Sequence, residues 1–137
     1  MGEVRVKVKL TNSIDEALAR RGQITKEEIR SYEADALIDT GAVSSVVPKN
    51  VMTQLGVLSI GNRLAEYADG RKDAVELTEP VTFNIIGRIA IEPAMVLGDE
   101  VIIGQTILEV LDLQVDCQNQ KLIPNPAHPD QPVVKIK

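Results

Sequence analysis

One carboxylate in the sequence stands where chemistry is expected. Asp39 follows the apolar run Ala36–Ile38 and precedes Thr40 and Gly41. Because the apolar run predicts a buried strand, we expect the Asp39 carboxylate in a restricted place of low dielectric. Ionised carboxylates occupy such places when they are hydrogen-bonded or used in catalysis. A strand followed by an ordinary polar turn is the alternative interpretation of the same residues.

Peptide hydrolysis by a carboxylate requires a second acid group. One carboxylate takes a proton from water while another acid protonates or polarises the carbonyl oxygen. Two carboxylates at close range can do this, because they cannot both ionise and therefore share one proton. The chain holds a single Asp-Thr-Gly triplet, so the second Asp39 must come from another copy across a twofold axis.

Other catalytic classes fit the sequence poorly. His128 is the only histidine and Cys117 the only cysteine, which excludes a zinc site of the usual Cys/His type and a nucleophilic triad. The glycine-containing segments at Gly61 and Gly70 lack the spacing of a phosphate-binding loop. The sequence therefore implies a protein without a metal or cofactor.

Three further residues receive structural interpretations. Asp35 and Asp112 lie near apolar segments but have no partner acid, so they are predicted to be surface charges. Cys117 is predicted to be a small core residue of the last hairpin. His128 lies in a proline-rich segment and is expected to be solvated.

The residues around the triplet resemble the retropepsin-like (clan AA) aspartic protease family. Leu37–Ala42 followed by Ser44–Val47 is similar to the family's first signature, which is apolar-apolar-Asp-Thr-Gly-Ala, then a small hydroxyl residue and an apolar pair. Ile102–Gly104 is similar to its second signature, which leads into a helix. Between them, Tyr67–Gly70 corresponds to the tip of the flap hairpin. The resemblance covers most of residues 29–117.

Two positions depart from the viral members of this family. Those members often carry Asp two residues after the triplet glycine and Arg just after the second-signature glycine, and the two form an ion pair that braces the dimer. Here the positions hold Val43 and Gln105. Both partners differ together, which is consistent with a cellular version of the fold. The segment Leu113–Ile136 extends beyond the viral endpoint and is a candidate for a different subunit contact.

The resemblance implies a homodimeric aspartic endopeptidase in which Asp39 of each subunit activates one water. Thr40 would hydrogen-bond across the dimer, and Gly41 would leave room for close backbone approach. Ala42 and Gly104 would complete the support of the active site, with Gly104 holding the loop from below. Four flap residues would exclude water and hold an extended peptide by main-chain pairing: Tyr67, Ala68, Asp69 and Gly70. An ordinary exposed hairpin, with Tyr67 packed on the sheet, is the alternative.

The elements that must position these residues are mostly strands. Within Val4–Leu10, apolar residues alternate with charged ones, which is the pattern of a half-buried strand. Residues 29–38 are predicted to form a second strand that returns beside it. Between them, Ser13–Glu16 is typical of a capping box that opens a short helix ending near Gly22. A second box, Thr25–Glu28, is compatible with either a helical turn or a loop.

The rest of the chain is predicted as short strands with two more helical segments. Pro48 begins a helix that Gly56 ends, and residues 105–111 form another. Strands are expected at residues 63–68, 71–78, 81–86, 89–97 and 101–104, with turns at residues 69–70, 79–80 and 87–88. The last hairpin joins residues 113–117 and 121–124, and residues 133–136 are a candidate edge strand.

Composition bounds the class of protein. The 137 residues include 15 Lys and Arg against 20 Asp and Glu, a net charge of −5, and only 2% are aromatic. This balance argues against nucleic-acid binding, which needs a basic field. No apolar run approaches the roughly 18 residues of a membrane helix, and the N-terminus lacks the apolar segment of a signal peptide. A cytoplasmic protein without membrane contact is expected.

The expected fold is mostly β, a closed barrel of the acid-protease half-lobe type with one or two short helices and a flap hairpin. Residues 1–124 are predicted to form the protease domain, with residues 12–27 as an insertion, and residues 125–137 form a proline-rich tail. Two functions remain open: the endopeptidase, and a catalytically silent dimerisation module that binds extended peptides. An inactive monomer is a third. Fragments accumulating from unfolded casein would favour the enzyme.

Overall fold

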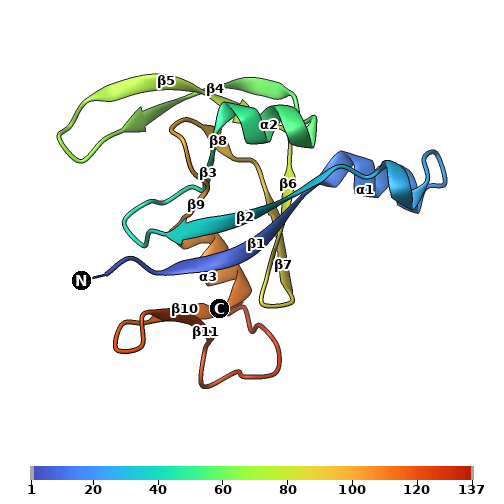
Figure 1. Cartoon of the computed structure of the whole chain (residues 1–137). Coiled ribbons are helices and arrows are strands. Elements are labelled where there is room, and N and C mark those ends of the chain that lie inside the picture. Colours follow the sequence, from blue (N-terminus) through green and yellow to red (C-terminus); the bar gives the residue numbers. More distant parts are fainter. Residues whose placement is uncertain (1, 137) are drawn as a thin grey trace.

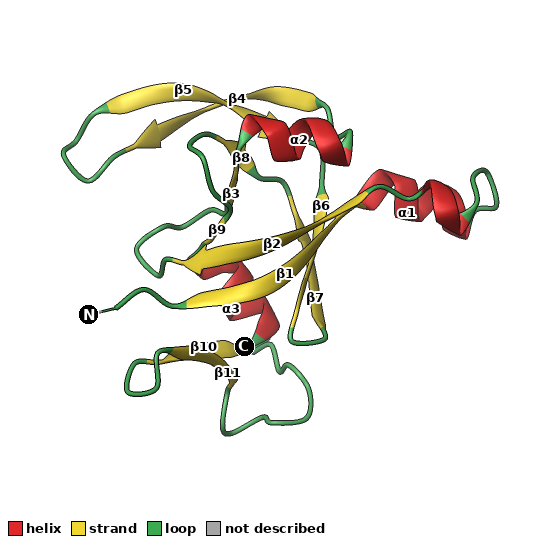
Figure 2. Ribbon diagram, in the orientation of Figure 1, coloured by secondary structure: helices red, strands yellow, loops and turns green. Residues whose placement is uncertain are grey.

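The computed structural model describes residues 2–136, and strands make up most of it (Figures 1 and 2). Within that range the strands are β1 (Arg5–Asn12), β2 (Ser31–Ile38), β3 (Val46–Val47), β4 (Ser59–Glu66), β5 (Lys72–Thr78), β6 (Val81–Ile85), β7 (Arg88–Glu92), β8 (Met95–Val96), β9 (Ile102–Ile103), β10 (Leu113–Asp116) and β11 (Lys121–Pro124). The helices are α1 (Ser13–Arg20), α2 (Lys49–Leu55), α3 (Gln105–Leu111) and the 3-10 turn η1 (Lys26–Glu28). The expected fold had one or two helices, whereas the residue patterns predicted three helical segments, and three α-helices are found at those places in the described residues.

Nine of the strands form one sheet in the order β4-β5-β8-β3-β9-β2-β1-β6-β7, and β10 pairs with β11 alone. The large sheet curls into a half-barrel, as Figure 1 shows, with the β4–β5 hairpin at one end of the strand order and the β6–β7 hairpin at the other. The mostly-β fold class is confirmed. The last hairpin is also confirmed, although it stands apart from the main sheet.

The first hairpin follows the predicted alternation. In β1 the apolar side chains Val8 and Leu10 are buried while the lysines between and before them are exposed. β2 pairs with β1 in antiparallel register, with Leu10 opposite Tyr32. This pairing holds the end of β2, and therefore Asp39, beside the N-terminal strand.

The helix between β1 and β2 begins one residue earlier than predicted. Asn12, not Ser13, is the N-cap: its Oδ1 accepts hydrogen bonds from the backbone N–H groups of Ile14 and Asp15, each at 3.0 Å. Asn12 also reaches across to Leu55, to whose carbonyl oxygen its Nδ2 donates at 2.9 Å. Ser13 instead shares a hydrogen bond with Thr82. The Asn12 amide can accept from the helix N–H groups with its oxygen and donate to Leu55 with its nitrogen. The shorter serine hydroxyl cannot make both contacts, and this favours Asn12 as the cap.

The second box forms a helical turn. η1 carries a complete capping box, in which the Glu28 carboxylate accepts from the Thr25 backbone N–H at 2.9 Å. This settles the choice between a turn and a loop that the sequence left open.

Several predicted strands differ from the structure in their bounds, and one does not form. β4 begins at Ser59 rather than residue 63, and the predicted strand 89–97 is divided into β7 and β8 at Pro93. Pro93 has no N–H to donate to a ladder, which explains the break. Between β6 and β7 the turn lies at Ile86 and Gly87, both with positive φ. Residues 133–136 form no strand.

The core consists of branched aliphatic side chains around Phe83, which is completely buried. Cys117 is not part of it: this side chain is exposed, because it lies in the turn after β10 rather than in a strand. None of the helices in residues 2–136 has the length and apolar character needed to cross a bilayer.

The proline-rich tail is tied to the end of α3. The Asp112 carboxylate accepts hydrogen bonds from Asn125 Nδ2 at 2.9 Å and from the Val133 backbone N–H at 3.0 Å, and its other contact is His128 Nδ1 at 2.6 Å. These donors lower the pKa of Asp112, with Asn125 the largest cause. Buried Arg88 donates to the backbone oxygens of Leu111 and His128. The predictions of a free surface charge at Asp112 and of a solvated His128 are therefore wrong.

Candidate active site

Asp39 stands in the first position after β2, at the start of a loop that we call the Asp39 loop (residues 39–45). Its backbone N–H donates to the Ile103 carbonyl oxygen of β9 at 3.0 Å. Its carboxylate accepts one side-chain hydrogen bond within residues 2–136, from the Gly41 backbone N–H at 2.9 Å. The Asp39 side chain is exposed in the single chain. The expected low-dielectric burial is therefore wrong for one copy, because the buried strand ends at Ile38 and the chain then turns outward.

The start of α3 lies directly beneath the Asp39 loop. Gln105 N–H donates to the Ala42 carbonyl oxygen at 2.7 Å, and Thr106 N–H donates to that of Val43 at 3.2 Å. The Gly104 N–H donates to Ser45 Oγ at 3.0 Å. A Cβ at position 104 would lie 2.6 Å from the Ser44 carbonyl oxygen. Only glycine allows this approach, so Gly104 contacts the loop from below.

The remaining residues of the first signature have different surroundings. Thr40 is exposed, and within residues 2–136 its side chain makes no hydrogen bond, whereas Ala42 is half-buried in the loop. Val43, which replaces the viral Asp, is 70% exposed. Gln105, which replaces the viral Arg, directs its side chain to Glu109 of its own helix. The two departures therefore make no contact with each other within one chain.

A cleft of about 420 Å³ separates the Asp39 loop from the β4–β5 hairpin. It is lined by Gly41, Ala42, Val43, Ser44, Val46, Arg63, Leu64, Ala65, Glu66, Tyr67, Met95 and Leu97. The loop and the hairpin thus form opposite walls of one space.

The hairpin tip is organised by its own side chains. Tyr67 Oη donates to Asp73 Oδ2 at 3.2 Å, which raises the pKa of Tyr67. The Arg71 guanidinium lies 4.8 Å from the centre of the Tyr67 ring and binds Asp69 at 2.8 Å. Asp69 has a lowered pKa because the Arg71 backbone N–H and side chain both donate to it. Tyr67 is half-buried and lines the cleft, while Asp69 faces solvent.

The hairpin turn is longer than the predicted two-residue type. Tyr67 N–H donates to the Arg71 carbonyl oxygen at 2.8 Å, and Gly70 N–H donates to that of Tyr67 at 2.9 Å. Ala68, Asp69 and Gly70 therefore form a three-residue loop, and Gly70 takes the left-handed conformation at φ 88°. This is the usual turn plus glycine bulge of such loops.

A second hollow of about 390 Å³ lies on the other side of Asp39. Its walls include Asp39 and Thr40, the N-terminal Gly2–Val4 segment, and Val115, Cys117 and Gln120 of the β10–β11 hairpin. The segments around it come from both ends of the chain. Asp39 thus borders this hollow, while Gly41 and Ala42 of the same loop line the cleft.

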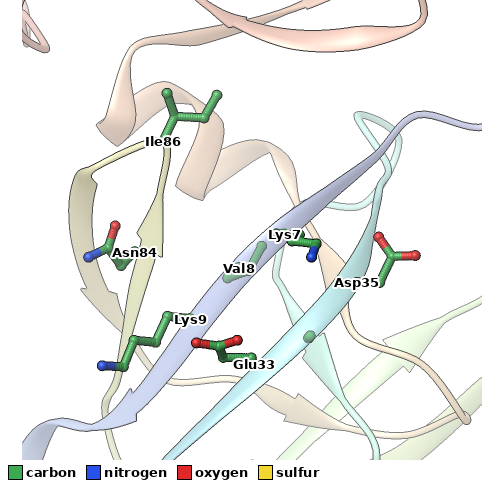
Figure 3. Close-up of a pocket in the computed structure, with 8 residues that line it drawn as sticks. Lys7, Val8, Lys9, Glu33, Asp35, Asn84 and Ile86 are labelled. Carbon is green, nitrogen blue, oxygen red and sulfur yellow. The ribbon is translucent and has the colours of Figure 1, made fainter.

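A third hollow, of about 530 Å³, lies away from the Asp39 loop. It lies over β1, β2 and the end of β6, as Figure 3 shows. Lys7 stands opposite Asp35, and Lys9 opposite Glu33, in the β1–β2 register. Opposite charges across neighbouring strands stabilise a solvated sheet face. Asp35 is exposed, as predicted.

Among residues 2–136, no group of three or more His, Cys, Asp or Glu side chains is close enough to hold a metal ion.

Two polar residues near the Asp39 loop were not identified from the sequence. Thr106 Oγ1 lies 3.0 Å from both the Val43 carbonyl oxygen and Glu92 Oε1. A hydroxyl two residues after the second-signature glycine was a visible signal, but nothing in the sequence links Glu92 to residue 43.

Comparisons with known proteins support the fold. No family model and no curated protein matches the sequence. Among solved structures, EIAV protease complexed with the inhibitor HBY-793 matches with a TM-score of 0.52 and 20% sequence identity. The match covers 79% of this chain and 86% of that chain. At this identity the likeness shows the fold alone: the chain has a retropepsin-like fold.

Proposed function

We propose that this protein is a homodimeric aspartic endopeptidase. One observation carries the proposal: in a retropepsin-like fold, the Asp-Thr-Gly turn presents the exposed Asp39 carboxylate at the start of a loop that lines a cleft. One chain supplies half of the acid pair that peptide hydrolysis needs. A twofold axis next to Asp39 would bring two such carboxylates together and remove them from water.

The two Asp39 groups divide the chemistry. Their mutual repulsion at short range keeps one protonated and the other ionised. The ionised group takes a proton from water as the water oxygen attacks the peptide carbonyl carbon, while the protonated group donates its proton to the carbonyl oxygen. In the collapse of the tetrahedral diol, the group that took the water proton gives it to the leaving nitrogen, the C–N bond breaks, and the other group takes back a proton from a diol hydroxyl.

The other residues receive supporting roles in this proposal. Gly41 donates to Asp39 and sets the direction of its carboxylate, and Gly104 and Ala42 link the loop to α3. Thr40 is exposed at the same surface and is proposed to bond with its counterpart in the dimer. Tyr67, Ala68, Asp69 and Gly70 form the flap that closes over an extended peptide.

The proposal also includes the extent and the setting of the domain. Residues 1–124 are assigned to the protease domain, with residues 12–27 as an insertion, and residues 125–137 to its tail. A cytoplasmic location is supported by the exposed free thiol of Cys117, which suits a reducing compartment.

The test compares two aspartates: Asp39, which is proposed to be catalytic, and Asp35, which is not. In Asp39→Asn we expect casein cleavage to fall at least about 100-fold, because the amide can neither take nor give the proton. In Asp35→Asn, which changes an exposed carboxylate of β2, cleavage should stay near the wild-type level. Both variants should keep the dimer mass in sedimentation. Wild-type rates in Asp39→Asn would contradict the assignment, and binding of casein without fragments would favour the silent peptide-binding module.

A further inference from the structure

A hydroxyl behind the Asp39 loop faces two acceptors. Thr106, in the first turn of α3, places Oγ1 3.0 Å from the Val43 carbonyl oxygen and 3.0 Å from Glu92 Oε1 at the end of β7. Val43 belongs to the Asp39 loop, and Glu92 is half-buried. Thr106 therefore connects a carboxyl group to the backbone of the loop that carries Asp39.

The number of hydrogens makes this connection depend on protonation. A threonine hydroxyl has one hydrogen, so it can donate fully to only one of two acceptors. When Glu92 is ionised, the charged carboxylate is the stronger acceptor and competes for that hydrogen. When Glu92 is protonated, its own O–H donates to Thr106 Oγ1, and the threonine hydrogen is free to point at the Val43 carbonyl oxygen. Both contacts are then satisfied at once.

We propose that Glu92 is a positioning residue whose protonation fastens the Asp39 loop to the start of α3 through Thr106. The catalytic consequence of this inference rests on the proposed function, because the fastened loop carries Asp39, the residue proposed to activate water. The structural part, a proton-linked contact between β7, α3 and the loop, stands independently of catalysis.

The surroundings of Glu92 favour the protonated form. Burial is the largest cause that raises the pKa of Glu92, against the opposing effects of the Thr106 hydroxyl and the Ser45 backbone amide. Because the folded chain binds this proton more tightly than the unfolded chain, the contribution of Glu92 to stability is full at low pH. It is lost as the pH rises through the folded pKa.

The charged groups on the neighbouring elements have other partners. β6 and β8 carry no titratable side chain, and α3 carries only Glu109, which accepts from Gln105. On β7 itself, Arg88 is bound to the backbone at the end of α3. In the loop, Asp39 is bound by Gly41 N–H and exposed. Glu92 is therefore the group on these elements whose proton can direct Thr106.

The experiment is a substrate-free NMR titration of the full chain. In the wild type we expect the Glu92 carboxyl carbon and the amides of Val43, Ser45 and Thr106 to titrate with one common midpoint, above the ordinary glutamate value. In Glu92→Gln the side-chain amide can donate to Thr106 at every pH, so the amide shifts should lose that titration and stay near their acid-limit values. Glu109→Gln, on the outer side of α3, is the matched control and should leave the titration unchanged.

Two further variants separate the possible outcomes. Asp39→Asn should keep the common titration, and its loss there would assign the effect to Asp39 and overturn the proposal. In Thr106→Val the Glu92 carbon should still titrate while the Val43 amide stops following it. Loop amides that do not change with pH in the wild type would also overturn it. If the wild type shows the titration but never cleaves casein, the proposed function fails while the linkage stands.

In an active enzyme the linkage has a kinetic signature. As the pH rises through the pKa of Glu92, we expect kcat/KM of the wild type to decline. Over the same pH range Glu92→Gln should keep the kcat/KM that it has at low pH, with the dimer mass unchanged. An identical pH profile in the two proteins would contradict the catalytic part of the inference.

Discussion

Glycine is required at position 104 by the space available there. Its φ is an ordinary −91°, so the backbone conformation itself would accept other residues. The constraint comes from the Ser44 carbonyl oxygen, which would lie 2.6 Å from an added Cβ. Gly41 is constrained more gently, since a Cβ there would lie 3.2 Å from Asp39 Oδ1. Both glycines act on the Asp39 loop through contact distances.

We therefore expect Gly104→Ala to displace the Asp39 loop. The cost in free energy of unfolding should be about 1–3 kcal/mol, the range of overpacking in a tight site, and casein cleavage should fall with it. Gly22→Ala is the control: Gly22 has φ 75° and open space around it, so alanine should cost about 1–2 kcal/mol of backbone strain and leave cleavage intact. Urea unfolding and initial rates measure both effects. A Gly104→Ala enzyme with wild-type rates would separate the loop from catalysis.

Side-chain partners were harder to predict than backbone elements. Cys117 lies in a turn, and Asp112 gathers the tail, because both outcomes depend on where distant segments pack. The sequence indicated the Asp39 carboxylate and the Thr40 hydroxyl, but it did not indicate which groups each of them contacts. Asp39, Gly41 and Gly104 could be singled out because their motif combines residue type with position in a strand or at a helix start.

At the scale of elements, the segment between β1 and β2 that carries α1 and η1 is held by an ion pair. Asp15 is 5% exposed, and its carboxylate accepts from Arg30 Nε at 2.9 Å, from Arg30 Nη2 at 3.0 Å and from the Arg30 backbone N–H at 3.0 Å. The side-chain bond from Arg30 is the main cause that lowers the pKa of Asp15. Arg30 itself is half exposed to water, so the pair is partly screened.

Asp15→Asn should lower the free energy of unfolding by about 1–2 kcal/mol at neutral pH, because charge-assisted hydrogen bonds are lost. The folded pKa of Asp15 is depressed, so its contribution is present above the ordinary aspartate pKa and disappears as the pH falls through the folded value. The difference between wild type and variant should therefore shrink in acid. Denaturant titrations at several pH values measure it, with exposed Asp130→Asn as control. A difference that is constant with pH would contradict the assignment.

The elements that could be predicted are those with a regular hydrophobic pattern or with a proline or glycine at their ends. The alternation of β1, and the Pro48 and Gly56 positions around α2, are local signals that tertiary packing did not change. The division of the strand at Pro93 and the Asn12 cap depend on which neighbour each residue meets. The region 133–136 has strand-forming residues, but Asp112 holds Val133 by its backbone N–H instead.

At the scale of the whole molecule, the exposed Asp39 and the hollow beside it face away from the core. The N-terminal segment and the β10–β11 hairpin both border this surface. A second copy placed on it would cover the Asp39 carboxylate and supply the missing acid group. In the proposed dimer, the β4–β5 hairpins of the two copies would cover one shared site at the twofold axis.

The central claim is that each active site needs Asp39 from two chains. The most direct measurement is casein cleavage by wild type and Asp39→Asn chains unfolded together, refolded in varying ratio and assayed at fixed total concentration. Random pairing predicts activity that follows the square of the wild-type fraction, so an equal mixture retains about a quarter of the activity. Activity proportional to the wild-type fraction, about one half in that mixture, would show that a single chain cleaves alone and would contradict the account.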